Sequence, residues 1–428
     1  MRRRIKYSTI LIHCLSLSFG QGYMNGLGIG HYYDNQGITT AGGGLTKLLP
    51  EYQSNVSLTN PSTWHHLKYT HLSLSYGSNE NSMTEKSILN GYSGLAKAVW
   101  IVPIKSKGSL GITISPYSDQ RISLSDNDST DYRMFDDTLQ YKRSFNRYGG
   151  IMSVKLGASR ELKGGYGLGM MFNMLFGSSR QNKSILFGGS SIVQTSRMRY
   201  SGLLMELFFT YPIKEELKIM LGSKYSLIPL DALVTTRHLF DDEDGDGYHD
   251  YYNSLDYEFP NPIDVESSNE HRMKGVHNPT EYLIGLSARL FERSSLAVEF
   301  CSFNDMGVSP SVYEPGLNDW IQSTYDGRIS ITRFPDDLSI NWMDKFVFRT
   351  GFTIKQHTLS ESKTMITENG FTLGLGFKFK VVGNQLDVNY YLGQRKYSNG
   401  FNDELIQQFQ IGVGLSDLWF VKRRRKKG

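Results

Sequence analysis

The sequence predicts an all-β fold, a transmembrane antiparallel β-barrel of about 14 strands with an N-terminal hatch. Over residues 371–381 every odd position is apolar, as at Phe371 and Leu373, and every even position is small or polar, as at Thr372 and Gly374. Successive side chains of a strand point to opposite faces, so this segment has one apolar face and one polar face. The pattern recurs through most of the chain, which is typical of a barrel with lipid outside and water inside.

Composition agrees with membrane-crossing strands. The chain is 39% hydrophobic and 13% aromatic, with 43 glycines in 428 residues. No stretch approaches the roughly 18 consecutive apolar residues that a membrane helix needs. We therefore expect an integral protein of a Gram-negative-type outer membrane.

The first 20 residues predict a signal peptide. Four basic residues, Arg2, Arg3, Arg4 and Lys6, precede an apolar core at 10–19, and small residues lie before Gln21. Without them the chain has 42 basic and 42 acidic side chains. Six of the basic groups lie at 422–427, so the remaining body is net negative, which argues against a nucleic-acid partner. We expect residues 422–428 to be a solvated, basic periplasmic tail.

Twelve segments alternate clearly and predict strands of a barrel at 64–421. They lie at 72–76, 110–114, 152–158, 166–176, 203–211, 217–221, 282–290, 296–300, 346–354, 371–381, 386–392 and 409–415. Weaker candidates lie at 121–124, 139–145, 191–200, 226–236 and 328–334. An even number keeps both termini periplasmic, which gives about 14 strands, with limits of twelve and sixteen. Short polar links such as 163–165 belong at the periplasmic rim, and residues 239–279 form one long extracellular loop.

Residues 21–63 alternate poorly and are rich in glycine, so they predict a periplasmic arm or a plug folded into the lumen. Gly26, Gly28 and Gly30 lack the preceding strand and the third spacing of a dinucleotide-binding loop. Nucleotide binding is therefore not expected. Asn60-Pro61-Ser62 ends this segment before the first strand.

Several segments together resemble the long-chain fatty acid transporter (FadL) family of outer-membrane proteins, in its divergent, uncharacterised branch. They are 24–30, Asn60-Pro61, 102–104 with 111–118, 148–150 with 154–157, 175–177, 348–352, 370–376, 393–395, 412–415 and 418–423. The resemblance implies a 14-stranded barrel plugged by an N-terminal hatch. It also implies passive uptake of hydrophobic small molecules such as long-chain fatty acids, which leave through a gap beside a kinked strand. Asn60 and Pro61 would be the hinge of the hatch, although Ser62 stands where the family usually has Ala.

Charged residues on the predicted polar faces offer candidate ligand contacts. These residues are Lys155, Glu206, Lys218, Arg289, Glu299, Arg349 and Asp387. A structural network of paired charges is the favoured interpretation. If the ligand is a fatty acid, Arg289 and Arg349 are the candidates to bind its carboxylate.

Two other functional classes stay open. An enzyme is disfavoured and no catalytic residue is assigned, because no Gly-x-Ser-x-Gly motif occurs and Ser and His are scattered. The alternative is a surface secretion or assembly partner, since barrels related to this family can carry proteins at the cell surface. A transporter should have a continuous apolar path from the outer loops to a wall gap, whereas a partner should have a filled lumen and an exposed apolar outer patch. Other expected partners are outer-membrane lipid and, during biogenesis, the barrel assembly machinery.

One acidic motif predicts a calcium site in the long loop. Asp242, Asp244, Asp246 and Asp250 alternate with glycines that permit a tight turn, and the Tyr248 carbonyl can add an oxygen. The spacing resembles thrombospondin type 3 loops, but Asn253 stands where an EF-hand has its bidentate Glu. The alternative is a solvated acidic loop. No other cofactor is expected.

Calcium should order residues 239–256 and protect them from proteolysis. We expect EDTA to accelerate protease nicking of this loop, and Asp244→Ala with Asp246→Ala to abolish the protection by calcium. Peptide mapping of the digest measures both effects. Nicking that is unchanged by EDTA and by both substitutions would contradict the site.

Overall fold

The computed structural model describes residues 23–417, apart from thirteen short gaps. The gaps are 34–36, 51, 53–54, 84–88, 105–107, 126–129, 135–136, 188–189, 242–268, 309–317, 337–338, 381–382 and 399–402. The predicted signal peptide, calcium motif and basic tail therefore lie outside the described residues.

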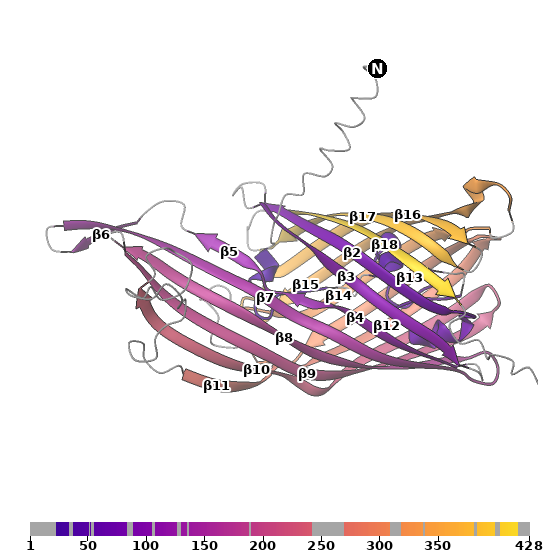
Figure 1. The fold of residues 1–428 in the computed structure, drawn as a ribbon, viewed down its shortest axis with the longest axis horizontal. Helices are drawn as coiled ribbons and strands as arrows, with labels where there is room; N and C mark the ends of the chain where they lie inside the picture. The colour runs from indigo at the N-terminus through magenta and orange to yellow at the C-terminus, as the bar shows by residue number, and fades with distance from the viewer. Residues whose placement is uncertain are drawn as a thin grey trace, which may run out of the picture.

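One antiparallel sheet closes on itself to form the barrel (Figure 1). Its strands are β2 (Thr70–Met83), β3 (Leu89–Ile104), β4 (Gly108–Asp119), β5 (Ile122–Ser125), β6 (Thr130–Met134), β7 (Asp137–Glu161), β8 (Gly167–Phe187), β9 (Ser190–Lys214), β10 (Leu217–Asp241), β11 (Asn269–His277), β12 (Pro279–Phe291), β13 (Ser294–Asp305), β14 (Ile321–Arg333), β15 (Phe346–Leu359), β16 (Met365–Lys380), β17 (Asn384–Tyr397) and β18 (Glu404–Asp417). β4, β5 and β6 follow one another along β7, and β11 and β12 share β10. The described chain thus forms a 14-stranded barrel closed by β18 against β2, which confirms the predicted fold.

The alternating side chains lie on the outer and inner faces of the barrel as the sequence predicts. On β16, Phe371, Leu373 and Leu375 are 44–51% exposed on the outer face, whereas Thr372 is fully buried on the inner face. Similar exposed apolar side chains surround the barrel and form the surface that contacts lipid. Among the described residues no helix is long and apolar enough to span a membrane.

Both ends of the described barrel, Thr70 and Asp417, pair with each other at the rim that carries the short turns. This is the periplasmic rim. On the opposite, outer rim, β7, β9 and β10, each 25 residues long, project beyond most of the barrel together with β8, and β6 and β11 pair with this projecting part (Figure 1). The barrel wall is therefore much taller on one side than on the other.

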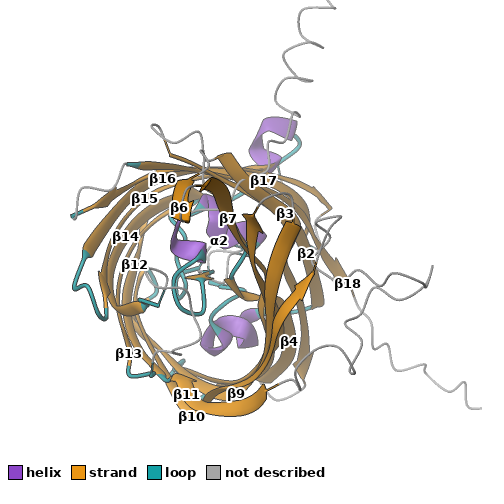
Figure 2. Ribbon diagram, turned by 90° about the vertical axis from the view of Figure 1, so that its left-hand side faces the viewer, coloured by secondary structure: helices purple, strands orange, loops and turns teal. Residues whose placement is uncertain are grey.

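The segment before β2 lies inside the lumen (Figure 2). It contains η1 (Tyr23–Asn25), β1 (His31–Tyr32), α2 (Ile38–Gly42) and η2 (Pro61–His66). β1 pairs with β4, α2 contacts β16 and β17, and η2 contacts β7, β8 and β9. Because these elements bury Met24, Ile38 and Trp64 inside the cylinder, the hydrophobic core of the protein lies in the lumen.

β3 is absent from both the clear and the weaker strand candidates. Its lumen-facing Val99 and Ile101 are 2% and 0% exposed and pack in the same cluster as Trp64. Its lipid-facing side is apolar too, as at Trp100. With both faces apolar, the alternation that marks the other strands disappears.

Placing a charge on the lipid face should destabilise the barrel. We expect Leu373→Arg to lower the free energy of unfolding by about 2–4 kcal/mol, because arginine near the bilayer midplane loses hydration. Ile340→Arg is the matched control, since Ile340 is 100% exposed before β15. Urea unfolding in lipid vesicles measures the difference, and equal losses in the two variants would argue against a lipid-facing Leu373.

Candidate functional site

The junction between the hatch and the wall is built around Asn60. This residue is fully buried and caps η2: its Oδ1 accepts the Ser62 N–H at 3.0 Å, and its Nδ2 donates to the Leu48 carbonyl at 3.0 Å. Pro61 begins η2, where a missing backbone N–H costs nothing. The Ser62 and Thr210 hydroxyl oxygens lie 2.6 Å apart, which ties η2 to β9. The predicted hinge residues thus lie in a tightly packed cap.

Glycines on the wall leave room for η2. The Trp64 ring is fully buried, and a Cβ on Gly157 would lie 2.8 Å from it. A Cβ on Gly169 would collide with the backbone nitrogen of Ser62. These positions require glycine because the hatch backbone and the indole approach the wall closely.

A second hatch segment is held by wall carboxylates. The backbone N–H groups of Lys47 and Leu48 donate to Glu299 at 3.0 and 2.8 Å. The Lys47 ammonium lies 2.6 Å from Glu281, which also pairs with Lys224 of β10. Buried carboxylates need such donors, since an uncompensated buried charge is costly.

Most predicted lumen charges are buried and paired with one another. Lys155 lies 2.8 Å from Glu206, and Arg349 lies 2.5 Å from Asp387. Glu299 also contacts Arg328 at 3.3 Å. The structure therefore places five of the seven predicted charges in buried ion pairs: Lys155, Glu206, Glu299, Arg349 and Asp387. Removing one member would leave a buried charge without compensation.

The other two predicted charges lie elsewhere. Arg289 is exposed at the periplasmic end of β12, where its backbone N–H donates to the Glu216 carbonyl at 2.8 Å. Lys218 is half-buried and donates to Asn55 of the hatch. Arg289 and Arg349 are therefore not neighbours in the lumen, and the carboxylate contact stays a prediction for both. The calcium residues Asp242, Asp244, Asp246, Tyr248 and Asp250 lie outside the described chain.

Further charge pairs, which sequence reasoning missed, hold the outer half of the plug. Arg395 of β17 lies 2.6 Å from Glu368 and 2.8 Å from Glu404. His31 of β1 lies 3.3 Å from the same guanidinium. Burial and the Arg395 charge lower the pKa of His31 to about 3, so the imidazole is neutral at pH 7. The signal in the sequence for these pairs was polar side chains at inward positions two residues apart, such as Arg395 and Tyr397.

A break in strand pairing lies beside β4. β3 pairs with β4 only from Ala98, opposite Ile114, down to Ile104. Beyond this point β4 shifts register against β7 between Pro116 and Ser118, and Ser118 pairs with Tyr32 of β1 inside the barrel. The upper half of β3 therefore pairs with β2 alone. Proline in a strand marks an edge or a bulge, so Pro116 carried a readable signal for this kink.

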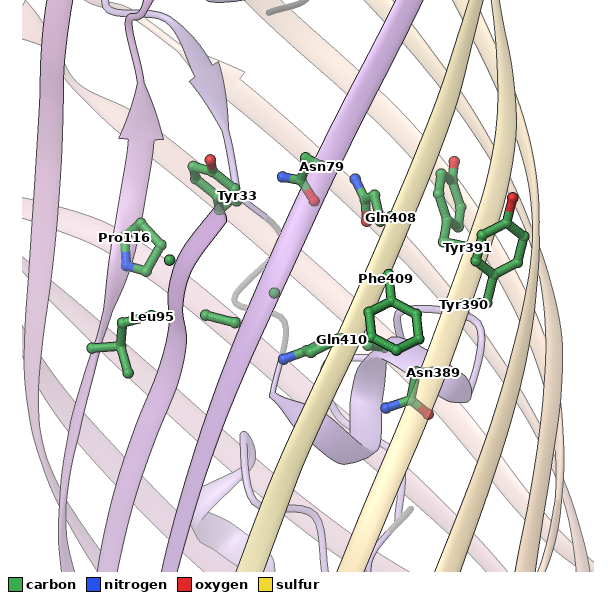
Figure 3. A pocket seen from close by; sticks show the side chains of 14 residues that line it. Tyr33, Asn79, Leu95, Pro116, Asn389, Tyr390, Tyr391, Gln408, Phe409 and Gln410 are labelled. Atoms are coloured by element: carbon green, nitrogen blue, oxygen red, sulfur yellow. The ribbon is translucent and has the colours of Figure 1, made fainter. Parts of the chain in front are cut away.

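We call this break in pairing between β3 and β4 the seam. A small cavity lies along it (Figure 3). It is lined by the hatch residues Tyr33 and Ala41 and by wall residues that include Leu95, Pro116, Asn389 and Phe409. The wall is thin here because Gly77 of β2 pairs with Gly94 of β3. The cavity volume is about 30 Å³.

Two further cavities lie deeper in the described lumen. One of about 30 Å³ is lined by the Lys155, Glu206 and Glu281 charges, and one of about 60 Å³ by His31, Lys224 and Lys355. A water molecule occupies about 30 Å³ of liquid volume. These spaces are therefore large enough for water, and both charged and apolar side chains line them.

Enlarging Gly169 should displace the hatch. We expect Gly169→Val to expose η2, because the new side chain collides with Ser62. The measurement is maleimide labelling of a Thr63→Cys probe, which is 1% exposed in the parent, in a Cys301→Ser background. Gly327→Val is the control, since a Cβ there meets nothing within 4 Å. Equal labelling of both variants would contradict the close packing of η2 on β8.

Solved structures of similar fold include a FadL homologue and two toluene transporters. A Pseudomonas aeruginosa FadL homologue has a TM-score of 0.54 and 10% identity, covering 89% of this chain and 98% of its own. The Ralstonia pickettii toluene transporter TbuX has a TM-score of 0.51 and 11% identity, covering 89% and 98%. The Pseudomonas putida toluene transporter TodX has a TM-score of 0.51 and 12% identity, covering 94% and 99%. At these identities the likeness establishes a FadL-like barrel fold.

Family comparison covers almost the whole chain. A search of curated proteins found no match. The profile of the family described as BamG matches residues 25–426, which include nearly all of the hatch and every described barrel strand. The chain is therefore an integral outer-membrane barrel and a member of the BamG family.

Proposed function

We propose that this chain is a plugged outer-membrane barrel that serves as a partner in the assembly of other outer-membrane proteins. The observation that carries the proposal is the filled lumen. η2 is capped into the wall through Asn60, and Glu299 and Glu281 hold the segment around Lys47. The family name BamG supports a link to the barrel assembly machinery.

The size of the lumen cavities supports this role over conduction. The largest of the three cavities described above is about 60 Å³, and lysine, histidine and carboxylate groups line it together with aromatic side chains. This volume is enough for only a few water molecules. A long alkyl chain would need a continuous apolar path several times larger.

The tall side of the barrel suits a partner protein. β7, β8, β9 and β10 continue past the lipid-facing band and present a sheet beyond the outer rim (Figure 1). Such a sheet gives a rigid platform without adding a separate domain. An assembly partner needs a fixed surface of this kind, whereas a conduit needs a free lumen.

Uptake of hydrophobic molecules is the second candidate, and the seam beside β4 favours it. The pairing of β3 with β4 stops at Ala98, and the cavity there reaches from the hatch residue Tyr33 to the lipid-facing Phe409. The solved relatives TodX and TbuX are described as toluene transporters. For uptake the hatch would have to move, and binding of a fatty acid at Arg349 would have to displace Asp387.

A disulfide that fixes the hatch to the wall would distinguish the assembly role from the uptake role. The Ser62 and Thr210 oxygens are 2.6 Å apart, so Ser62→Cys with Thr210→Cys places two thiols within reach of a disulfide. If the chain acts as a plugged assembly partner, the oxidised variant should maintain normal levels of other outer-membrane proteins. If it conducts, uptake of radiolabelled toluene or oleate should fall on oxidation and recover on reduction.

Depletion of the chain gives the direct test of the assembly role. We expect the abundance of several other outer-membrane barrels to fall at least about threefold, measured by quantitative proteomics of outer membranes. The locked variant should restore it, with Ser62→Cys alone as the control. Unchanged barrel abundance together with lost hydrophobic uptake would overturn the assembly role in favour of transport.

A further inference from the structure

The outer rim carries a cluster of basic side chains that neither proposed role uses. We define the basic patch as Arg180 on β8, Arg197 and Arg199 on β9, and Arg272 and Lys274 on β11. The patch lies on the outer face, because its members alternate with inward residues such as Met198, which is fully buried. All but the half-buried Arg180 are exposed.

Strand register brings the patch together. Arg180 pairs directly with Arg197 across β8 and β9. Arg199 pairs with Leu233 of β10, which in turn pairs with Arg272. Neighbouring strands are about 4.8 Å apart, so these cations cover four adjacent strands. Like charges placed directly opposite each other destabilise a sheet, and an anion bound over them would relieve the repulsion.

Few acidic side chains lie near the patch among the residues that the structure describes. On the described outer face of these strands beyond the lipid-facing band, the carboxylates are Asp231 and Glu270. Asp231 accepts the Gly275 N–H at 3.0 Å, and Glu270 accepts the Thr235 hydroxyl at 3.5 Å. Among the described side chains of this surface, the five basic groups therefore outnumber the two carboxylates.

The distance of the basic patch from the lipid-facing residues below it places the patch at the level of the lipid headgroups. Arg199 lies four residues above the lipid-facing Leu203 on β9, and Arg180 lies four above Phe176, which is 48% exposed on β8. Four residues extend about 14 Å along a strand, or about 10 Å along the membrane normal at the usual tilt. That distance reaches the polar interface of a bilayer, and an arginine side chain can extend further towards it.

We propose that the basic patch binds the phosphorylated headgroups of glycolipids in the outer leaflet. Arginine guanidinium groups bind phosphate through two parallel N–H···O bonds, and four of the five side chains are arginines. The patch continues the lipid-facing surface upward without an intervening loop in the described chain. A glycolipid that packs its acyl chains on Phe176 thus places its phosphates at the level of Arg180 and Arg199. This inference does not depend on either proposed function.

Binding of lipid A by the purified full chain in a nonionic detergent tests the proposal. We expect saturable, salt-sensitive binding of bisphosphorylated lipid A, measured by native mass spectrometry and by thermophoresis. The double substitution Arg197→Gln with Arg199→Gln should weaken lipid A binding at least about tenfold, because each basic side chain near an anionic lipid surface strengthens binding. Arg160→Gln with Lys214→Gln, exposed residues near the periplasmic rim, should change binding less than about twofold.

Two comparison ligands make the result decisive. Dephosphorylated lipid A should bind the parent and the patch variant equally weakly if phosphate is recognised. Heat-modified migration on gels verifies that each variant forms the barrel. Equal affinity of parent and patch variant for bisphosphorylated lipid A would overturn the proposal. It would also be overturned if the patch proved necessary for binding a polyglutamate peptide but not for binding lipid A.

Discussion

The satisfaction of polar groups inside a closed cylinder is the constraint on which the structure depends. A barrel in lipid must pair its backbone groups between strands, and β18 against β2 completes that ring. The lumen then encloses charges such as Arg395 and Glu281, which need partners at close range. The hatch supplies several of them, so the plug and the wall stabilise each other.

This coupling explains why the hatch has so little regular structure. α2 has five residues and β1 has two, and neither would be stable alone in water. The hatch instead obtains its conformation from side chains of the wall: Glu299 fixes the backbone of Lys47 and Leu48, and Thr372 donates to the Gly42 carbonyl. Displacing the hatch would break these bonds and leave wall carboxylates such as Glu299 with fewer donors.

The sequence alone predicted the parts of the fold that depend only on the two-residue alternation of apolar and polar side chains. Alternation over 371–381 predicted a strand, which the structure places in β16 (Met365–Lys380), and the face that meets lipid, because no contact outside the strand is needed to sort its side chains. It failed at β3, where Val99 and Ile101 are apolar to fit Trp64. It also could not pair Arg395 with Glu368, since register between neighbouring strands depends on turns and bulges.

The seam beside β4 shows how the barrel combines closure with a weak point. Pro116 cannot donate to a ladder, and the strand responds by turning inward to pair Ser118 with the hatch residue Tyr32. The backbone groups that β4 withdraws from β3 are thus satisfied by the plug rather than by water. Because the same inward turn anchors the hatch and ends the pairing with β3, any motion of the hatch must alter the wall at this place. The seam and the plug therefore form one mechanical unit, whether the barrel conducts a small molecule or contacts a partner protein.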